Sequence, residues 1–187
     1  MDDKEARLIG AAIEVFSRYG IRRATMGDIA EQAGVSRQTL YANFASKQDI
    51  MMAAIMQMAM STMKTIETAW ADAGSIGDKL DIYFEHAVVD YFDKIRAMPD
   101  ANDLLTGTSG AGFEPLHAAE AAKVAALAAQ FAPYERQLEA AGTTAADLAD
   151  LVFHSSANFK YVAADKAHLR RLLASLKKAA LSLVGDC

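Results

Sequence analysis

The side chains with the most evident chemistry lie close together, between residues 36 and 47. Ser36 is followed directly by Arg37, Gln38 and Thr39. A guanidinium group can donate two hydrogen bonds to guanine, a glutamine amide can pair with adenine, and a threonine methyl group can contact thymine. The residue types in this stretch therefore indicate a surface that reads base edges in the major groove of DNA.

Other polar residues around this stretch suit the DNA backbone. Tyr41 and Lys47 can bind phosphates at the edges of the groove, and Asn43 lies on the same outward side. Backbone N–H groups at the start of a helix offer further phosphate sites, and the helix dipole strengthens them. The alternative interpretation is a polar helical hairpin that only faces solvent, and the hairpin pattern alone does not decide between the two.

Two short helices joined by a tight turn are needed to present these side chains. Thr25 and Ser36 are good N-caps, and they predict helices to Ala33 and to about Asn43. Gly34 supplies the positive φ that the turn requires. The small residues Ala30 and Ala33 allow the two helices to cross closely. Apolar residues are expected to face a preceding helix and form a core: Ile13, Phe16, Ile29, Val35, Leu40 and Phe44.

The whole chain shows helical periodicity and predicts an all-α fold. It has only three prolines among 187 residues, and alanine, leucine and methionine dominate its composition. Pro133 is expected to bend one helical region, and the loop 106–113 carries three of the glycines. The predicted helices cover residues 4–19, 26–33, 37–43, 47–73, 78–98, 102–105, 114–141, 145–163 and 166–184.

Composition alone does not predict nucleic-acid binding. The net charge is −5, but residues 1–50 carry seven basic and seven acidic residues, so the excess acid lies in the remainder. DNA contact must then depend on a few placed charges. The single cysteine, Cys187, fits a reducing cytoplasm, and we expect a cytoplasmic protein without a secretory signal or a membrane span.

Residues 5–52 resemble the DNA-binding domain of the TetR family of regulators. The match is strongest over 25–30 and 34–47, and Ala11, Phe16 and Gly20 also agree with the family's first helix. The resemblance implies base contacts from the helix that begins after Ser36. It implies phosphate contacts from Thr25, Tyr41 and Lys47. Many members carry histidine where this chain has Asn43, whose amide can still donate to phosphate. The DNA-binding residues that we predict are Thr25, Ser36, Arg37, Gln38, Thr39, Tyr41, Asn43 and Lys47.

The predicted organisation has two domains, joined through the long fourth helix. Residues 1–46 form a three-helix helix-turn-helix domain, and residues 47–187 form a helical domain for ligand binding and dimerisation. The family resemblance implies that this second domain is divergent, binds a small molecule and dimerises. Its last two helices, about 144–163 and 166–184, each carry an apolar stripe, and pairing them with a second copy would form a four-helix bundle.

The ligand site is predicted only as a set of candidates. Six methionines lie between residues 51 and 63, and methionine adapts to a wall that changes shape. Ordinary core packing is the alternative explanation. Mostly apolar walls with a few polar groups are typical of a ligand pocket. The candidate ligand-binding residues are Met56, Met60, Met63, Tyr83, His86, Asp90, Phe113, His117, Phe131, His154 and Asn158.

The sequence gives no support for an enzyme or a metalloprotein. It shows no phosphate-binding glycine loop, dinucleotide fingerprint or nucleophile motif, and the four histidines lack zinc-site spacing. We predict no cofactor and no metal. The leading hypothesis is a dimeric repressor that a small-molecule effector releases from a near-palindromic DNA operator. Two alternatives stay open: a helical small-molecule-binding protein with an idle DNA head, and an architectural DNA-binding protein without a ligand.

Overall fold

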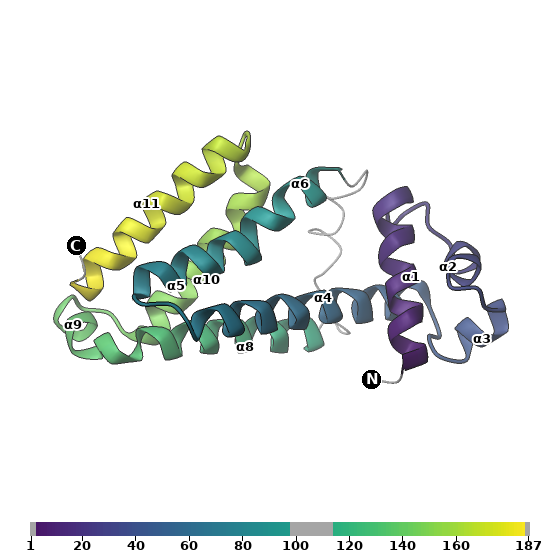
Figure 1. Cartoon of the computed structure of the whole chain (residues 1–187), viewed down its shortest axis with the longest axis horizontal. Helices are drawn as coiled ribbons and strands as arrows, with labels where there is room; N and C mark the ends of the chain where they lie inside the picture. The colour runs from purple at the N-terminus through teal and green to yellow at the C-terminus, as the bar shows by residue number, and fades with distance from the viewer. Residues whose placement is uncertain (1–2, 98–113, 186–187) are drawn as a thin grey trace. The chain divides into compact units, whose positions relative to one another are not determined.

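The computed structural model describes residues 3–97 and 114–185, and these residues form helices joined by short turns (Figure 1). They divide into two compact units within α4, after Met60. The first unit holds the residues up to Met60, and the second holds 61–93 and the described residues from Ala118 onward. The all-α fold class is confirmed for the described residues. The domain boundary at residue 46 remains a prediction.

The first unit begins with α1 (Asp3–Tyr19), α2 (Met26–Gln32) and α3 (Arg37–Tyr41). Gly20 and Gly34 end α1 and the turn after α2 with φ angles of 78° and 65°, which a β-carbon would disfavour. The predicted core is confirmed, since Phe16, Ile29 and Leu40 are buried with residues of α1 and the start of α4. Helix α3 is shorter than predicted, because Ala42 already caps it.

Helix α4 (Lys47–Trp70) carries the chain from the first unit into the second. The Ser46 hydroxyl accepts a hydrogen bond of 3.1 Å from the Asp49 amide, as expected for an N-cap. The helix ends three residues earlier than predicted. Trp70 at its end is buried, and the indole N–H donates to the Lys79 carbonyl at 2.9 Å. This bond fixes the turn that leads into the next helix.

The region predicted as one helix over 78–98 consists of three segments. Helix α5 (Ile76–Phe84) starts earlier, because Ser75 caps it by accepting a hydrogen bond from the Asp78 amide. A π-helical turn, η1 (Glu85–Val89), follows, and α6 (Asp90–Ala97) continues the chain. A π turn places one extra residue in the helix and shifts the faces on either side of it. Periodicity did not reveal this turn.

The second unit is completed by the C-terminal half of the chain. Helix α8 (Glu114–Phe131) ends in a short 3-10 turn, η2 (Ala132–Tyr134), and α9 (Glu135–Ala140) follows, so the predicted break at Pro133 is confirmed. Helices α10 (Ala145–Val162) and α11 (Lys166–Val184) have almost the predicted bounds, with Thr144 and Asp165 as N-caps. Figure 1 shows α11 running beside α5.

The core of the second unit brings together residues from all its helices. Tyr83 and Phe84 of α5 are buried with Phe131 of α8, Leu148 of α10 and Leu173 of α11. Part of the predicted apolar stripe on α10 stays outside this core, since Leu151 is 53% exposed and Val162 is 59% exposed.

Some predictions fall outside the described residues: the helix 102–105, the loop 106–113 with its glycines, and Cys187. In the described ranges, every helix is either too short or too polar to span a lipid bilayer.

Candidate functional site

The start of α2 is fixed by a reciprocal hydrogen-bonded cap. The Thr25 side chain accepts a bond of 3.2 Å from the Asp28 amide, and the Thr25 amide donates to Asp28 Oδ2 at 2.8 Å. The Thr25 hydroxyl also donates to Asp28 Oδ2 at 2.8 Å. These bonds, the side-chain one first, hold the pKa of the Asp28 carboxyl below its usual value. The cap leaves Thr25 exposed at a helix N-terminus, where a phosphate could approach.

The start of α3 is fixed in a similar way by Ser36. Its side-chain oxygen accepts a hydrogen bond of 3.1 Å from the Thr39 amide and lies 2.9 Å from the Thr39 hydroxyl. Leu40 is fully buried and anchors the helix to the core of the first unit. The opposite side of α3 presents polar side chains to solvent, among them Arg37 and Gln38.

Arg37 rests against the first turn of α2. A β-carbon built on Gly27 would lie 2.6 Å from Arg37 Nη2 and 3.0 Å from Arg37 Cζ. The guanidinium charge also acts on Asp28 and contributes to lowering its pKa, although less than the hydrogen bonds do. Glycine at position 27 therefore provides the space in which the Arg37 head group lies.

The two other outward residues near the end of α3 differ in how they are held. The Asn43 amide donates a 2.6 Å hydrogen bond to the Thr39 carbonyl, one turn earlier. Tyr41 is 52% exposed. The phenol ring thus offers a large apolar surface and a hydroxyl group to a partner molecule, a combination that suits contact with a phosphate and its sugar.

Lys47 occupies a different place from the one that a phosphate contact requires. Its Nζ donates to three carbonyl oxygens of the loop before α2: Ile21 at 2.8 Å, Arg22 at 3.3 Å and Ala24 at 3.0 Å. Three bonds use all three protons of an ammonium group. Lys47 therefore holds the loop between α1 and α2, a role that the sequence analysis missed.

A further link inside the first unit also went unpredicted. The Gln32 amide at the end of α2 donates a 2.5 Å hydrogen bond to Glu14 Oε2 of α1. The contact joins residues 18 positions apart, so no local pattern could reveal it. It ties the first two helices together on the surface.

The family assignment rests on the residues just described. Residues 8–54 match the model of the bacterial regulatory proteins of the tetR family. This range covers α1, α2, α3 and the first turns of α4. The chain belongs to the TetR family.

Curated relatives match mainly this N-terminal part of the TetR-family chain. The transcriptional activator FasR of Mycolicibacterium smegmatis is 41% identical over 54 residues, which are 29% of this chain and 25% of FasR. The uncharacterized regulator YerO of Bacillus subtilis is 33% identical over 70 residues, 36% of this chain and 24% of YerO. The chain spans about a quarter of the length of these relatives in the matched segments. These relatives are regulators rather than enzymes, in agreement with the sequence prediction.

Solved structures match the fold over nearly the whole chain. A transcriptional regulator from Cytophaga hutchinsonii superposes with a TM-score of 0.74 at 17% identity, covering 99% of this chain and 98% of that one. A TetR-family regulator from Pectobacterium atrosepticum gives a TM-score of 0.70 at 22% identity, covering 96% and 93%. At these identities the likeness concerns the fold, including the helical second unit.

The predicted ligand-binding residues do not gather at one place in the second unit. Tyr83 and Phe131 are buried in its core. Burial raises the pKa of the Tyr83 phenol, and a hydrogen bond with Ser156 opposes this shift. Met63 is half-buried against the same core. These three residues therefore pack the second unit, which is the alternative that the sequence left open.

The polar candidates lie mostly at the surface. His86 Nδ1 is 3.1 Å from Asp90 Oδ2, and His154 Nε2 is 3.4 Å from Asp150 Oδ1, in two pairs open to solvent. His117 and Asn158 are exposed as well. In the first unit, Met56 is half-buried and Met60 is 67% exposed. Phe113 lies outside the described residues.

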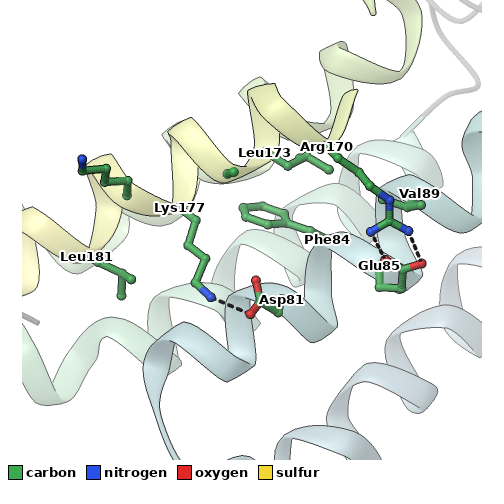
Figure 2. Close-up of a pocket in the computed structure, with 10 residues that line it drawn as sticks. Asp81, Phe84, Glu85, Val89, Arg170, Leu173, Lys177 and Leu181 are labelled. Carbon is green, nitrogen blue, oxygen red and sulfur yellow. Dashed lines mark hydrogen bonds and ion pairs between the residues drawn. The ribbon is translucent and has the colours of Figure 1, made fainter. Parts of the chain in front are cut away.

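A groove of about 620 Å³ lies where α11 crosses α5 and η1 (Figure 2). Phe84, Val89 and Leu173 form part of its apolar lining. Two ion pairs span it. Lys177 Nζ is 2.5 Å from Asp81 Oδ2, and the Arg170 guanidinium donates two bonds of 3.1 Å to the Glu85 carboxylate. The sequence analysis named none of these lining residues, because the charges meet across about ninety positions of sequence.

The interior of the second unit holds two lysines that the sequence analysis also missed. Lys160 of α10 donates a long hydrogen bond of 3.4 Å to the Ala87 carbonyl in the π turn. Burial, and secondarily the charge of Lys123, lowers the pKa of Lys160 to about 8. Burial likewise lowers the pKa of Lys123 of α8, while Glu120 opposes that shift. Two cations thus lie near each other in partly apolar surroundings.

Proposed function

We propose that this TetR-family chain is a transcription regulator that binds a specific double-stranded DNA site through α3. The observation that carries the proposal is the outward polar side of α3. Arg37 and Gln38 are exposed there, while Leu40 on the opposite side anchors the helix. Helix-turn-helix proteins place such a second helix in the major groove, with its N-terminal residues on the bases.

The remaining predicted contacts divide into backbone and base contacts. Thr25 at the N-terminus of α2, together with Tyr41, is proposed to bind phosphates and to set the register of α3. Arg37, Gln38 and Thr39 are proposed to read bases, with Ser36 fixing the helix start. Asn43 is proposed to donate to a phosphate. Lys47 is proposed to support binding indirectly, through the loop whose carbonyls it holds.

A homodimer is the proposed active form. Leu151, Tyr161 and Val162 on α10 are apolar and between 38% and 59% exposed. A second copy packed against α10 and α11 would bury them in a four-helix bundle with two-fold symmetry. Two heads related by this symmetry would bind half-sites about 34–36 Å apart, which predicts a near-palindromic operator.

Regulation by a small-molecule effector in the second unit is the last part of the proposal. The effector would favour one arrangement of the dimer, and a coupling of about 1–3 kcal/mol changes DNA affinity by roughly 5- to 150-fold. We propose that the unliganded protein represses and that the effector releases it. The one curated relative above with a stated direction, FasR, is named as an activator. Transcription assays must therefore determine the sign. DNA binding places the protein in the cytoplasm.

The test measures binding to the DNA upstream of the protein's own gene by fluorescence anisotropy, at two salt concentrations. The native chain should bind one sequence specifically, and the affinity should fall as salt rises, because phosphate contacts release counterions. Arg37→Ala should weaken specific binding by at least about tenfold, since a bidentate base contact contributes about 1–3 kcal/mol. Arg136→Ala, which removes an exposed arginine of α9 in the second unit, is the matched control and should bind as the native chain does.

Failure to find a specific site at any salt concentration would overturn the assignment as a DNA reader. Equal losses for Arg37→Ala and Arg136→Ala would show that the arginine side chain of α3 has no special role. The dimer is tested separately by sedimentation, in which a monomeric mass at micromolar concentration would contradict it.

A further inference from the structure

Lys123 and Lys160 come from different helices and meet inside the second unit. Both are half-buried. Their sequence neighbours Val124 and Phe159 pack against the core, as does Ala87 of the π turn. The charge of Lys123 acts on Lys160, so the two ammonium groups are close in space.

These two cations have few partners for their charge and their protons. An ammonium group carries three donors. Lys160 uses one of them in a long bond to the Ala87 carbonyl. Within the described part of the chain, Lys123 has no hydrogen bond and no carboxylate within 4.0 Å. Removing a cation from water is costly unless an anion or several acceptors replace the water.

Glu120 is the acidic group nearest to this pair in its effect. It lies one helical turn before Lys123 on α8 and acts electrostatically on that residue, but it is not among the charges that act on Lys160. It also acts on the Tyr161 hydroxyl at the edge of the cluster. Glu120 thus compensates one of the two lysines in part and leaves Lys160 without an acidic neighbour.

We propose that Lys123 and Lys160 bind the carboxylate of a small molecule whose apolar part packs beside Val124 and Phe159. One carboxylate oxygen for each ammonium would supply the acceptors that both lysines lack, and charge-assisted hydrogen bonds of this kind are among the strongest in proteins. The π turn contributes the Ala87 carbonyl, which holds Lys160 at the site. This inference rests on the proposed function in one respect, because it names the chemical class of its effector.

The experiment uses the full-length chain without DNA and follows thermal unfolding. Benzoate and hexanoate are the probes, and benzamide and hexanamide are their neutral counterparts of similar shape. Both carboxylates should raise the Tm in a saturable way, because a ligand that binds only the folded state stabilises it. The amides should produce at most a small shift. Lys123→Met and Lys160→Met should each weaken the apparent carboxylate affinity by at least tenfold, whereas Lys64→Met, which removes an exposed lysine of α4, should leave it unchanged.

The contrary results are equally specific. If neither carboxylate raises the Tm above the value with its amide, the site does not take a carboxylate. If Lys160→Met lowers the Tm without ligand and retains the carboxylate effect, Lys160 serves only to support the π turn. Because DNA is absent, a carboxylate effect in a chain that binds no specific DNA would keep this inference and reject the proposed function. Specific DNA binding without a carboxylate effect would do the reverse.

Discussion

The guanidinium group of Arg37 lies on the backbone of Gly27, at a place where any β-carbon at position 27 would come within 2.6 Å of Arg37 Nη2. This contact joins the first turns of the two helices of the helix-turn-helix. A base-reading arginine would have to leave this resting place to reach the major groove. The cost of leaving is small, because the side chain is exposed and flexible.

Gly27→Ala therefore separates two possible roles of Arg37. The added methyl group fills the resting place and pushes the flexible head group outward, so the fold should persist and the Tm should not fall. We expect operator affinity to stay within about threefold of the native value, whereas Arg37→Ala weakens it at least about tenfold. Anisotropy titrations of both variants measure the difference. Equal, large losses in both would mean that the guanidinium binds DNA from its position on α2.

Lys47→Met should destabilise the loop between α1 and α2. The substitution removes the donor of three carbonyl oxygens while retaining most of the apolar stem. Losing hydrogen bonds to a charged group costs about 1–3 kcal/mol. Amide hydrogen exchange in residues 21–30 should become faster, and DNA binding should weaken as a consequence. Arg7→Met, which removes an exposed cation of α1, is the control. Unchanged exchange together with lost DNA affinity would instead indicate a direct phosphate contact by Lys47.

Thr25→Ala should remove the cap of α2 and lower stability by about 1 kcal/mol at neutral pH. The hydrogen bond from Thr25 lowers the pKa of the Asp28 carboxyl. A carboxyl whose pKa is lower in the folded state stabilises the fold above its ordinary pKa of 3.8 and loses this effect as the pH falls. Urea unfolding at neutral pH and at about pH 3 should then show a smaller difference between the variant and the native chain in acid. A difference that grows in acid would contradict this interpretation.

Lys160→Met should change how stability depends on alkaline pH. Lys123 and, more weakly placed, Glu120 are the charged groups around Lys160. Since the pKa of Lys160 falls from 10.5 to about 8 in the folded state, the unfolded chain binds more protons between these values. The contribution of Lys160 to stability thus rises as the pH increases through this window. The variant should be more stable than the native chain at neutral pH, and the difference should shrink toward about pH 10. Lys64→Met should show no such trend.

Leu151→Asp should dissociate the proposed dimer. Leu151 is 53% exposed on α10, and a carboxylate there would be buried without a partner in a dimer interface. Sedimentation at micromolar concentration should give a monomer, and operator affinity should fall because the two heads are no longer linked. Ala146→Asp adds the same charge near the start of α10 at another exposed position and should remain dimeric. A dimeric Leu151→Asp chain that binds its operator normally would exclude α10 from the interface.

The amino-acid sequence by itself determined the features that depend on neighbouring residues. The apolar period of α11, the caps at Thr144 and Ser36, the bend at Pro133 and the turn at Gly34 all matched the structure. Each of these follows from interactions over a few positions, such as a side-chain oxygen meeting an amide three residues later. The family pattern in residues 8–54 also has this local character.

The tertiary structure decided which distant side chains meet. No spacing along the chain places Arg37 on Gly27, Lys47 on the Ile21 carbonyl, or Lys177 beside Asp81, because these contacts depend on how two helices cross. The π turn of η1 adds to this, since one extra residue rotates the faces that follow it. For the same reason the predicted ligand-binding residues scattered between core and surface, while Lys123 and Lys160 came together from separate helices.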